Sequence, residues 1–364
     1  MRLLPIPGLI FTRGSALPVS TVLRGDSAFY VAAKDRVLLA EIQPYVQSVI
    51  WRLNGINEAH FTIAANDSKA TKLLLGMGNH FYAKFSNGLP DWGGVIDHPM
   101  EWSNDGTIVV DARGPQFELE NRYTGKNEAY TALSPGEILS GLILNTNAMR
   151  DTGIRMGTVW TGGGTHTVAF HHQKLYDVIR EQCCERLADA DYEVAPSISG
   201  NVITYTLNYV ETRGSQKEGV ALIEGHNAFG VCYSEQGPIT NSWYIIGSGA
   251  TWGGARPVGH AQNDDSIATY GLYEGVESYG DISSETMLNA IATNRLGVTD
   301  TPRIRVSARV IDKAPAKFSA YSVGDTIRCI MHTKGFDGLD GYVRVTAREY
   351  NPNENTCSLV LEVK

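Results

Sequence analysis

The last sixty residues of this chain constrain its fold more than any other segment. Between Arg303 and Lys364, apolar residues occupy every second position of four short runs. The four sets are Ile304, Val306, Ala308 and Val310; Ile327, Cys329 and Met331; Val343, Val345 and Ala347; and Cys357, Leu359, Leu361 and Val363. Because successive side chains of a strand point to opposite faces, each set lies on one face of a sheet. Loops rich in Gly, Asp, Asn and Pro separate the runs, which predicts a small antiparallel barrel or sandwich.

The first 115 residues show the same two-residue alternation. Residues 46–63 indicate a hairpin, because apolar residues alternate on both sides of Asn54-Gly55, a dipeptide favoured in hairpin turns. Further strands are expected at 81–85, 93–96 and 107–112. This part of the chain is therefore predicted to be an all-β unit.

The middle of the chain has helical signals instead. Ser134 and Glu137 match a capping box with a proline between them, which predicts the start of a helix. Residues 172–190 carry apolar side chains at spacings of three and four, so we expect a second helix there. A strand is expected at 203–209. A Gly-, Trp- and Tyr-rich stretch follows later, and a short helix is predicted from Ser284 to its end at Gly297.

Composition narrows the classes of function. The chain has 31 Lys and Arg against 39 Asp and Glu, a formal charge of −8. Avid nucleic-acid binding, which depends on neutralising phosphates, is therefore not expected. The five cysteines are odd in number and form no CxxC pair, so neither a zinc knuckle nor a disulfide framework is indicated. A reducing folding compartment fits this pattern.

Targeting signals are also absent from the sequence. No stretch approaches the ~20 apolar residues of a membrane helix, and the first ten residues lack a signal-peptide core. We expect synthesis in the cytoplasm and no membrane insertion by this chain.

No motif in the sequence specifies a cofactor or a metal. A Walker A loop and a nucleophile elbow are missing, and residues 247–253 only approach the Gly-x-Gly-x-x-Gly pattern. His166, His171 and His172 cluster, but neighbouring residues on a helix point about 100° apart, which makes shared ligation awkward. We expect no catalytic, cofactor-binding or metal-binding residues.

A set of three acidic residues close together in the sequence still permits an enzymatic alternative. Asp91, Asp97 and Glu101 could include a glycosidase pair, and Trp92 and Trp102 nearby could stack on sugars. Asp91 also precedes Trp92-Gly93-Gly94 in a predicted turn, where aspartate is common for turn formation alone. The turn interpretation is favoured.

Charged residues offer two further observations. Arg303, Arg305 and Arg309 share one face of a predicted strand. This face is either solvated or forms salt bridges with a neighbouring subunit, and both interpretations stay open. Asp264-Asp265 is interpreted as a loop feature.

Three segments carry a family resemblance. They are the hairpin at 50–63 with the later strand Trp92-Gly93-Gly94-Val95-Ile96, the amphipathic helix from Leu175 with the strand Asp191-Tyr192-Glu193-Val194, and residues 318–327 with Gly324-Asp325 before a strand. Through these segments the chain resembles the central tail-hub (baseplate hub) proteins of long-tailed phages, including the siphovirus Gp37-like tail proteins.

The resemblance implies a mainly β fold with two small antiparallel β-barrels and inserted α/β modules. Mapped onto this sequence, residues 1–115 are the first β-barrel domain and 116–205 an α/β module. Residues 206–364 are the second β-barrel domain, with a small insert near 234–297. Three copies are expected to form a ring whose six barrels mimic the six-fold tail tube.

The resemblance also implies a structural role and a set of partners. The ring is expected to join the tail tube to the tail tip in the virion and to surround a channel through which DNA passes without specific binding. Expected partners are two further copies, the distal tail protein, the tail tube, the tape measure protein, and tail fibre or receptor-binding proteins. The alternatives are a glycan-binding receptor module that depends on Trp92, Trp102 or Trp252, and a cell-wall-degrading enzyme that depends on Asp97 or Glu101.

Overall fold

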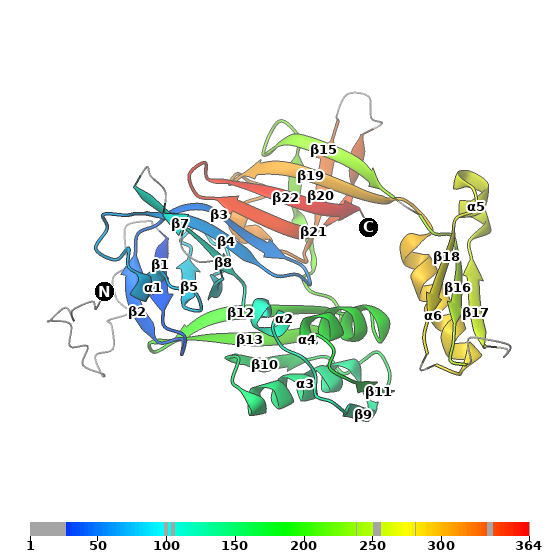
Figure 1. The fold of residues 1–364 in the computed structure, drawn as a ribbon. Helices are drawn as coiled ribbons and strands as arrows, with labels where there is room; N and C mark the ends of the chain where they lie inside the picture. The colour runs from blue at the N-terminus through cyan, green and yellow to red at the C-terminus, as the bar shows by residue number, and fades with distance from the viewer. Residues whose placement is uncertain are drawn as a thin grey trace.

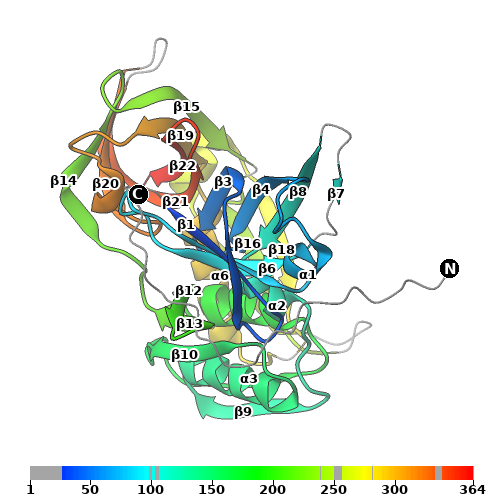
Figure 2. The same cartoon turned by 90° about the vertical axis from the view of Figure 1, so that its left-hand side faces the viewer.

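A computed structural model describes residues 27–97, 101–102, 106–237, 239–249, 256–280, 282–332 and 338–363. The fold is mainly β, as predicted from the sequence. Figures 1 and 2 show two β units side by side, a mixed module below both of them, and a small insert beyond the second β unit.

The two β units belong to one 14-stranded sheet. The first unit contains β1 (Ala28–Ala32), β2 (Leu38–Ile42), β3 (Tyr45–Arg52), β4 (Glu58–Ala64), β5 (His80–Lys84), β6 (Trp92–Ile96), β7 (Glu101–Trp102) and β8 (Thr107–Arg113). The second contains β14 (Gln216–Ile223), β15 (Ala228–Gln236), β19 (Arg303–Ile311), β20 (Thr326–Met331), β21 (Leu339–Asn351) and β22 (Thr356–Val363). The hairpin predicted at 46–63 and the four predicted C-terminal strands are all confirmed.

Strand pairing fuses the two units. β3 runs antiparallel to β21, with Trp51 opposite Arg348 and Val49 opposite Tyr350. A single apolar core continues across this seam, and the rings of Phe85 and Tyr350 meet edge to face with centroids 5.6 Å apart. Because both hydrogen bonds and core packing cross the seam, the two units form one rigid body.

The module combines α3 (Pro135–Met149) with two small sheets. β10 (Ile154–Val159) pairs in parallel with β13 (Val202–Val210), which pairs with β12 (Asp191–Ser199); β9 (Glu128–Leu133) pairs with β11 (His166–Phe170). The short α2 (Gln116–Glu120) leads into the module. The capping box of Ser134 and Glu137 is present as predicted. The module core also includes Leu38 and Tyr82 of the first β unit, so the two parts share buried surface.

The predicted second helix has an unexpected form. Only α4 (Leu175–Asp177) is α-helical, and a π-helix, η1, follows at Val178–Arg186. Its last turn closes with the Leu187 amide donating to the carbonyl of Gln182, five residues back. Buried residues in η1 recur at a spacing of five, at Val178 and Cys183, which the wider π turn brings near the same side.

The insert is a separate two-layer unit. It contains β16 (Ser242–Ile246), β17 (Val258–Gln262), α5 (Asp264–Tyr270), β18 (Glu274–Ser278) and α6 (Glu285–Thr299). Leu288 and Ile291 of α6 pack on Ile245 and form a core distinct from the other two. The N-cap at Ser284 is confirmed, but the predicted end of this helix is wrong, because α6 continues past Gly297 to Thr299.

Figure 1 shows the insert apart from the β units, at the ends of β15 and β19. One contact with the module places the Arg186 guanidinium 4.3 Å from the ring centroid of Tyr279. Within the part of the chain that the structure describes, no helix has the length and apolar content needed to span a lipid bilayer.

Candidate assembly surfaces

The structure separates the carboxylates considered for catalysis. Asp91 precedes β6 and Asp97 follows it, six residues later. At a rise of about 3.3 Å per residue, their Cα atoms lie roughly 20 Å apart, whereas glycosidase carboxylates lie within about 10 Å. Asp91 and Asp97 therefore do not form a catalytic pair. The side chain of Glu101 lies outside the described residues.

Both aspartates have structural contacts instead. Asp91 accepts a hydrogen bond from the Tyr82 hydroxyl. Burial, and then this carboxylate, raise the pKa of Tyr82 well above its ordinary value, so the phenol stays a donor. Asp97 lies 3.6 Å from Arg113, which also pairs with Glu120 at 2.9 Å. These contacts fix the two ends of β6.

Trp92, one of three tryptophans on which the glycan-binding alternative depends, is inside the protein. Trp92 is 1% exposed and packs against Phe81 with ring centroids 5.9 Å apart. A buried indole has no free face for a sugar from solvent. The side chain of Trp102 and all of Trp252 lie outside the described residues.

The clustered histidines bind the backbone. The His166 Nε2 is 2.8 Å from the carbonyl of Gly163, and the His171 Nδ1 is 2.7 Å from the carbonyl of Lys126. His172 has a φ of 50°, which places it in the turn before α4. Among the described residues, no group of three or more His, Cys, Asp or Glu side chains is arranged to hold a metal ion.

The arginine face predicted on β19 is exposed. Arg309 pairs with Glu354, and Arg303 lies 4.0 Å from Glu362. All four of these side chains are about half exposed, so each pair stabilises the fold by ~1 kcal/mol at most.

A buried carboxylate lies where the two β units and the module meet. Asp191, at the start of β12, is 5% exposed. Its carboxylate accepts from Asn54 Nδ2 at 2.8 Å, from the Arg213 amide at 2.7 Å and from the guanidinium of Arg344. One carboxylate thus joins the hairpin of the first β unit, the module, and β21 of the second.

Asn54 and Arg344 complete this junction. Asn54 has a φ of 51°, a left-handed conformation that asparagine tolerates well, and its Oδ1 accepts from the Tyr192 amide at 2.9 Å. Arg344 also donates to the carbonyls of Gly324 and Arg213 at 3.2 and 3.1 Å. Because Asp191, Asn54 and Arg344 all have hydrogen-bond partners in this network, we expect the junction to be stiff.

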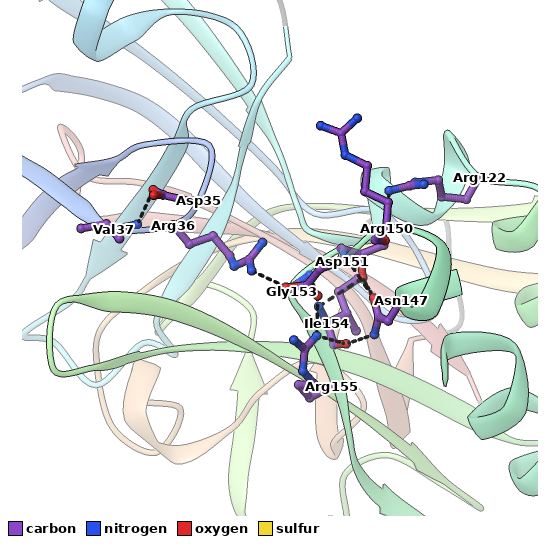
Figure 3. Close-up of polar contacts among 11 residues, drawn as sticks. Asp35, Arg36, Val37, Arg122, Asn147, Arg150, Asp151, Gly153, Ile154 and Arg155 are labelled. Carbon is purple, nitrogen blue, oxygen red and sulfur yellow. Dashed lines mark hydrogen bonds and ion pairs between the residues drawn. The ribbon is translucent and has the colours of Figure 1, made fainter. Parts of the chain in front are cut away.

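A second polar cluster joins the first β unit to the module (Figure 3). Asp151, after α3, pairs with Arg36 of the β1–β2 turn at 2.8 Å and with Arg155 at 2.7 Å. The hydrogen bond from Arg155 is the main reason that the pKa of Asp151 is far below its ordinary value. Arg122 and Arg150 lie beside the cluster, and the Arg122 Nη2 donates to the carbonyl of Arg150. We call these four arginines the arginine patch.

Sequence reasoning missed both clusters. Asp191 appeared only as part of a strand pattern, and Asn54 only as a turn residue. Their contacts span 137 residues between Asn54 and Asp191 and 153 between Asp191 and Arg344. Contacts at such separation leave no local periodicity or motif in the sequence.

Comparison with solved structures identifies the fold. The 43 kDa tail protein of prophage MuSo2 from Shewanella oneidensis aligns over 93% of this chain and 98% of its own, with a TM-score of 0.63 and 11% identity. The chain has the fold of a phage tail protein. Prophage tail protein gp18 from Listeria monocytogenes EGD-e aligns over 92% of this chain and 94% of its own, with a TM-score of 0.58 and 14% identity.

A tail protein from Neisseria meningitidis MC58 aligns over 93% of this chain and 96% of its own, with a TM-score of 0.59 and 9% identity. No protein-family model and no curated protein matches the sequence. At sequence identities of 9% to 14%, these comparisons show that the chain shares the fold of the three tail proteins.

Proposed function

We propose that this protein is a structural hub subunit of a phage tail or a tail-derived particle. The observation that supports this most strongly is the structural likeness to three tail proteins, each of which aligns with this chain over nearly the whole length of both. Three copies would form a ring that joins the tail tube to the tail tip in the virion and surrounds the DNA channel.

The architecture suits such a part. The β3–β21 seam and the Asp191 junction hold two β units and a module in fixed positions, as a subunit of a stiff ring requires. We propose residues 1–115, 116–205 and 206–364 as its domains, with the insert near 234–297. Asp91 and Asp97 hold the two ends of β6, which agrees with a structural role.

The proposed partners follow from the position in the tail. They are two further copies of this chain, the distal tail protein, the tail tube, the tape measure protein, and tail fibre or receptor-binding proteins. The net charge of −8 is consistent with DNA passing the protein without specific binding. Synthesis in the host cytoplasm is part of the same proposal.

Native mass tests this proposal. Light scattering on the purified chain across a concentration series should give three times the chain mass of 39.7 kDa, and negative-stain images should show rings. Antibody labelling of assembled particles should mark the end of the tail. A monomer at every concentration, together with particles unlabelled at the tail end, would contradict the proposal.

A further inference from the structure

The charge of this chain is concentrated in the insert. Residues 239–300 contain two arginines, no lysine and seven carboxylates, a net charge of −5 out of −8 for the whole chain. Three of these carboxylates lie in residues 264–274, which we call the insert tip. It contains Asp264, Asp265 and Glu274, all exposed, and no basic residue.

The insert tip also exposes large apolar side chains. Tyr270 is 44% exposed, Leu272 57% and Tyr273 48%. Three such residues within four positions, beside three carboxylates, are typical of a surface that a partner covers rather than of scattered surface apolar residues. The partner should combine positive charge with apolar area.

The arginine patch has these two properties. Asp151 holds Arg36 and Arg155, while the guanidinium of Arg150 points away from that carboxylate (Figure 3). Glu118 also interacts with Arg36, Arg122 and Arg150, so four arginines face two carboxylates and the patch keeps a positive charge. Arg122 and Arg150 are each next in sequence to an exposed apolar residue, Tyr123 at 51% and Met149 at 66%. The patch therefore matches the insert tip in both charge and apolarity.

The two surfaces cannot meet within one copy. In Figure 1 the β1–β2 turn that carries Arg36 lies at the left end of the molecule, and the insert lies at the right end. Surfaces that are complementary and lie at opposite ends produce head-to-tail contacts between copies, and such contacts close into a ring when the rotation per copy permits.

We propose that the insert tip of one copy docks on the arginine patch of the next copy in the ring. This rests on the proposed function, because it names the contact that would hold the homotrimer together. A second copy fits better than DNA, since phosphates account for the arginines but not for exposed Tyr123 and Met149, and the chain as a whole repels DNA.

Charge reversal tests the contact. Arg122→Glu with Arg150→Glu, and separately Asp265→Lys with Glu274→Lys, should each raise the dissociation constant of the trimer at least about tenfold, because like charges then face each other. All four substitutions in one chain should recover most of the loss. Sedimentation velocity gives the constants, and circular dichroism shows that each variant is folded.

Lys313→Glu with Lys317→Glu is the matched control, since it changes the net charge equally at exposed residues after β19, outside both surfaces. Equal trimer stability in the wild type and every variant would overturn the docking proposal and leave the hub proposal intact. A wild type that is monomeric at every concentration would overturn the docking proposal, and particles that are also unlabelled at the tail end would overturn the hub proposal. Loss of binding to a short DNA duplex in Arg122→Glu with Arg150→Glu, without loss of self-association, would assign the patch to nucleic acid instead.

Cross-linking locates the contact independently. Arg150→Lys keeps the charge and supplies an amine that a zero-length carbodiimide reagent can couple to a carboxylate. In a mixture of isotopically light and heavy chains, the expected product links position 150 of one copy to residues 264–274 of another. Links only within one copy, or only to other segments, would contradict the proposal.

Discussion

At the scale of single residues, Asp191 holds more of the structure together than its sequence context suggests. Asp191→Asn keeps the shape but places an amide against donors from Arg213 and Arg344, and it leaves Arg344 without its negative partner. We expect the free energy of unfolding to fall by about 3 kcal/mol, because breaking a buried ion pair leaves an uncompensated charge. Urea unfolding measures the change.

Asp340→Asn is the control for this prediction. Arg328 donates to Asp340 through two nitrogens at 2.7 Å, but both side chains are about half exposed. Solvent screens the pair, so its loss should leave stability nearly unchanged. Equal effects of the two substitutions would show that the Asp191 junction is not a structural centre.

His80 makes stability depend on pH. Its Nδ1 lies 2.8 Å from the hydroxyl of Tyr205, between the first β unit and the module, and burial lowers its pKa from 6.5 to about 4, with Arg36 adding to the effect. Between these values the unfolded chain binds a proton that the folded chain does not. Stability should therefore fall as pH falls from 6.5 to 4, by about 1.4 kcal/mol per pH unit and about 3 kcal/mol in all.

His80→Gln should remove this part of the pH dependence and leave the part due to carboxylates. His226→Gln, at an exposed histidine, is the matched control and should leave the profile unchanged. The measurement is the free energy of unfolding at a series of pH values. A wild-type slope that persists in His80→Gln would refute the assignment.

At the scale of elements, Gly94 sets the distance between β6 and β8. A Cβ at this position would lie 2.1 Å from the backbone carbonyl oxygen of Arg113 and 2.6 Å from the Trp92 ring. Since backbone cannot move aside cheaply, Gly94→Ala should destabilise the protein by about 1–3 kcal/mol or more. Gly219→Ala in β14, where the added Cβ meets nothing within 4 Å, should be close to neutral. Thermal unfolding of both variants decides whether this strand contact is tight.

Elements defined by local signals were predictable, and those defined by distant contacts were not. The hairpin with Asn54-Gly55, the capped start of α3 and the four C-terminal strands all follow from residues within a few positions of one another. The π-helix at Val178–Arg186 did not, because its apolar spacing also fits an α-helix. The sheet of the insert was missed for a different reason: β17 and β18 are short and mostly exposed, so they show little apolar alternation.

At the scale of the whole molecule, the sequence indicated the order of β and mixed units but not how they join. The seam between β3 and β21 and the junction at Asp191 connect residues separated by more than a hundred positions. Each partner is an ordinary strand or turn residue in its own segment. Only the folded chain shows that the two β units share one core, and that charge of opposite sign lies at opposite ends.

The insert should be removable without unfolding the rest. Gln236 at the end of β15 is paired with Arg303 at the start of β19, so replacing residues 237–302 with Asn-Gly would join two paired strands by a two-residue hairpin turn. The insert has its own core, so the core of the β units should stay intact and their unfolding midpoint should be close to that of the full chain. We expect this variant to be a folded monomer by light scattering, because it lacks the insert tip. A shortened chain that still forms trimers would place the contact between copies on the β units or the module instead.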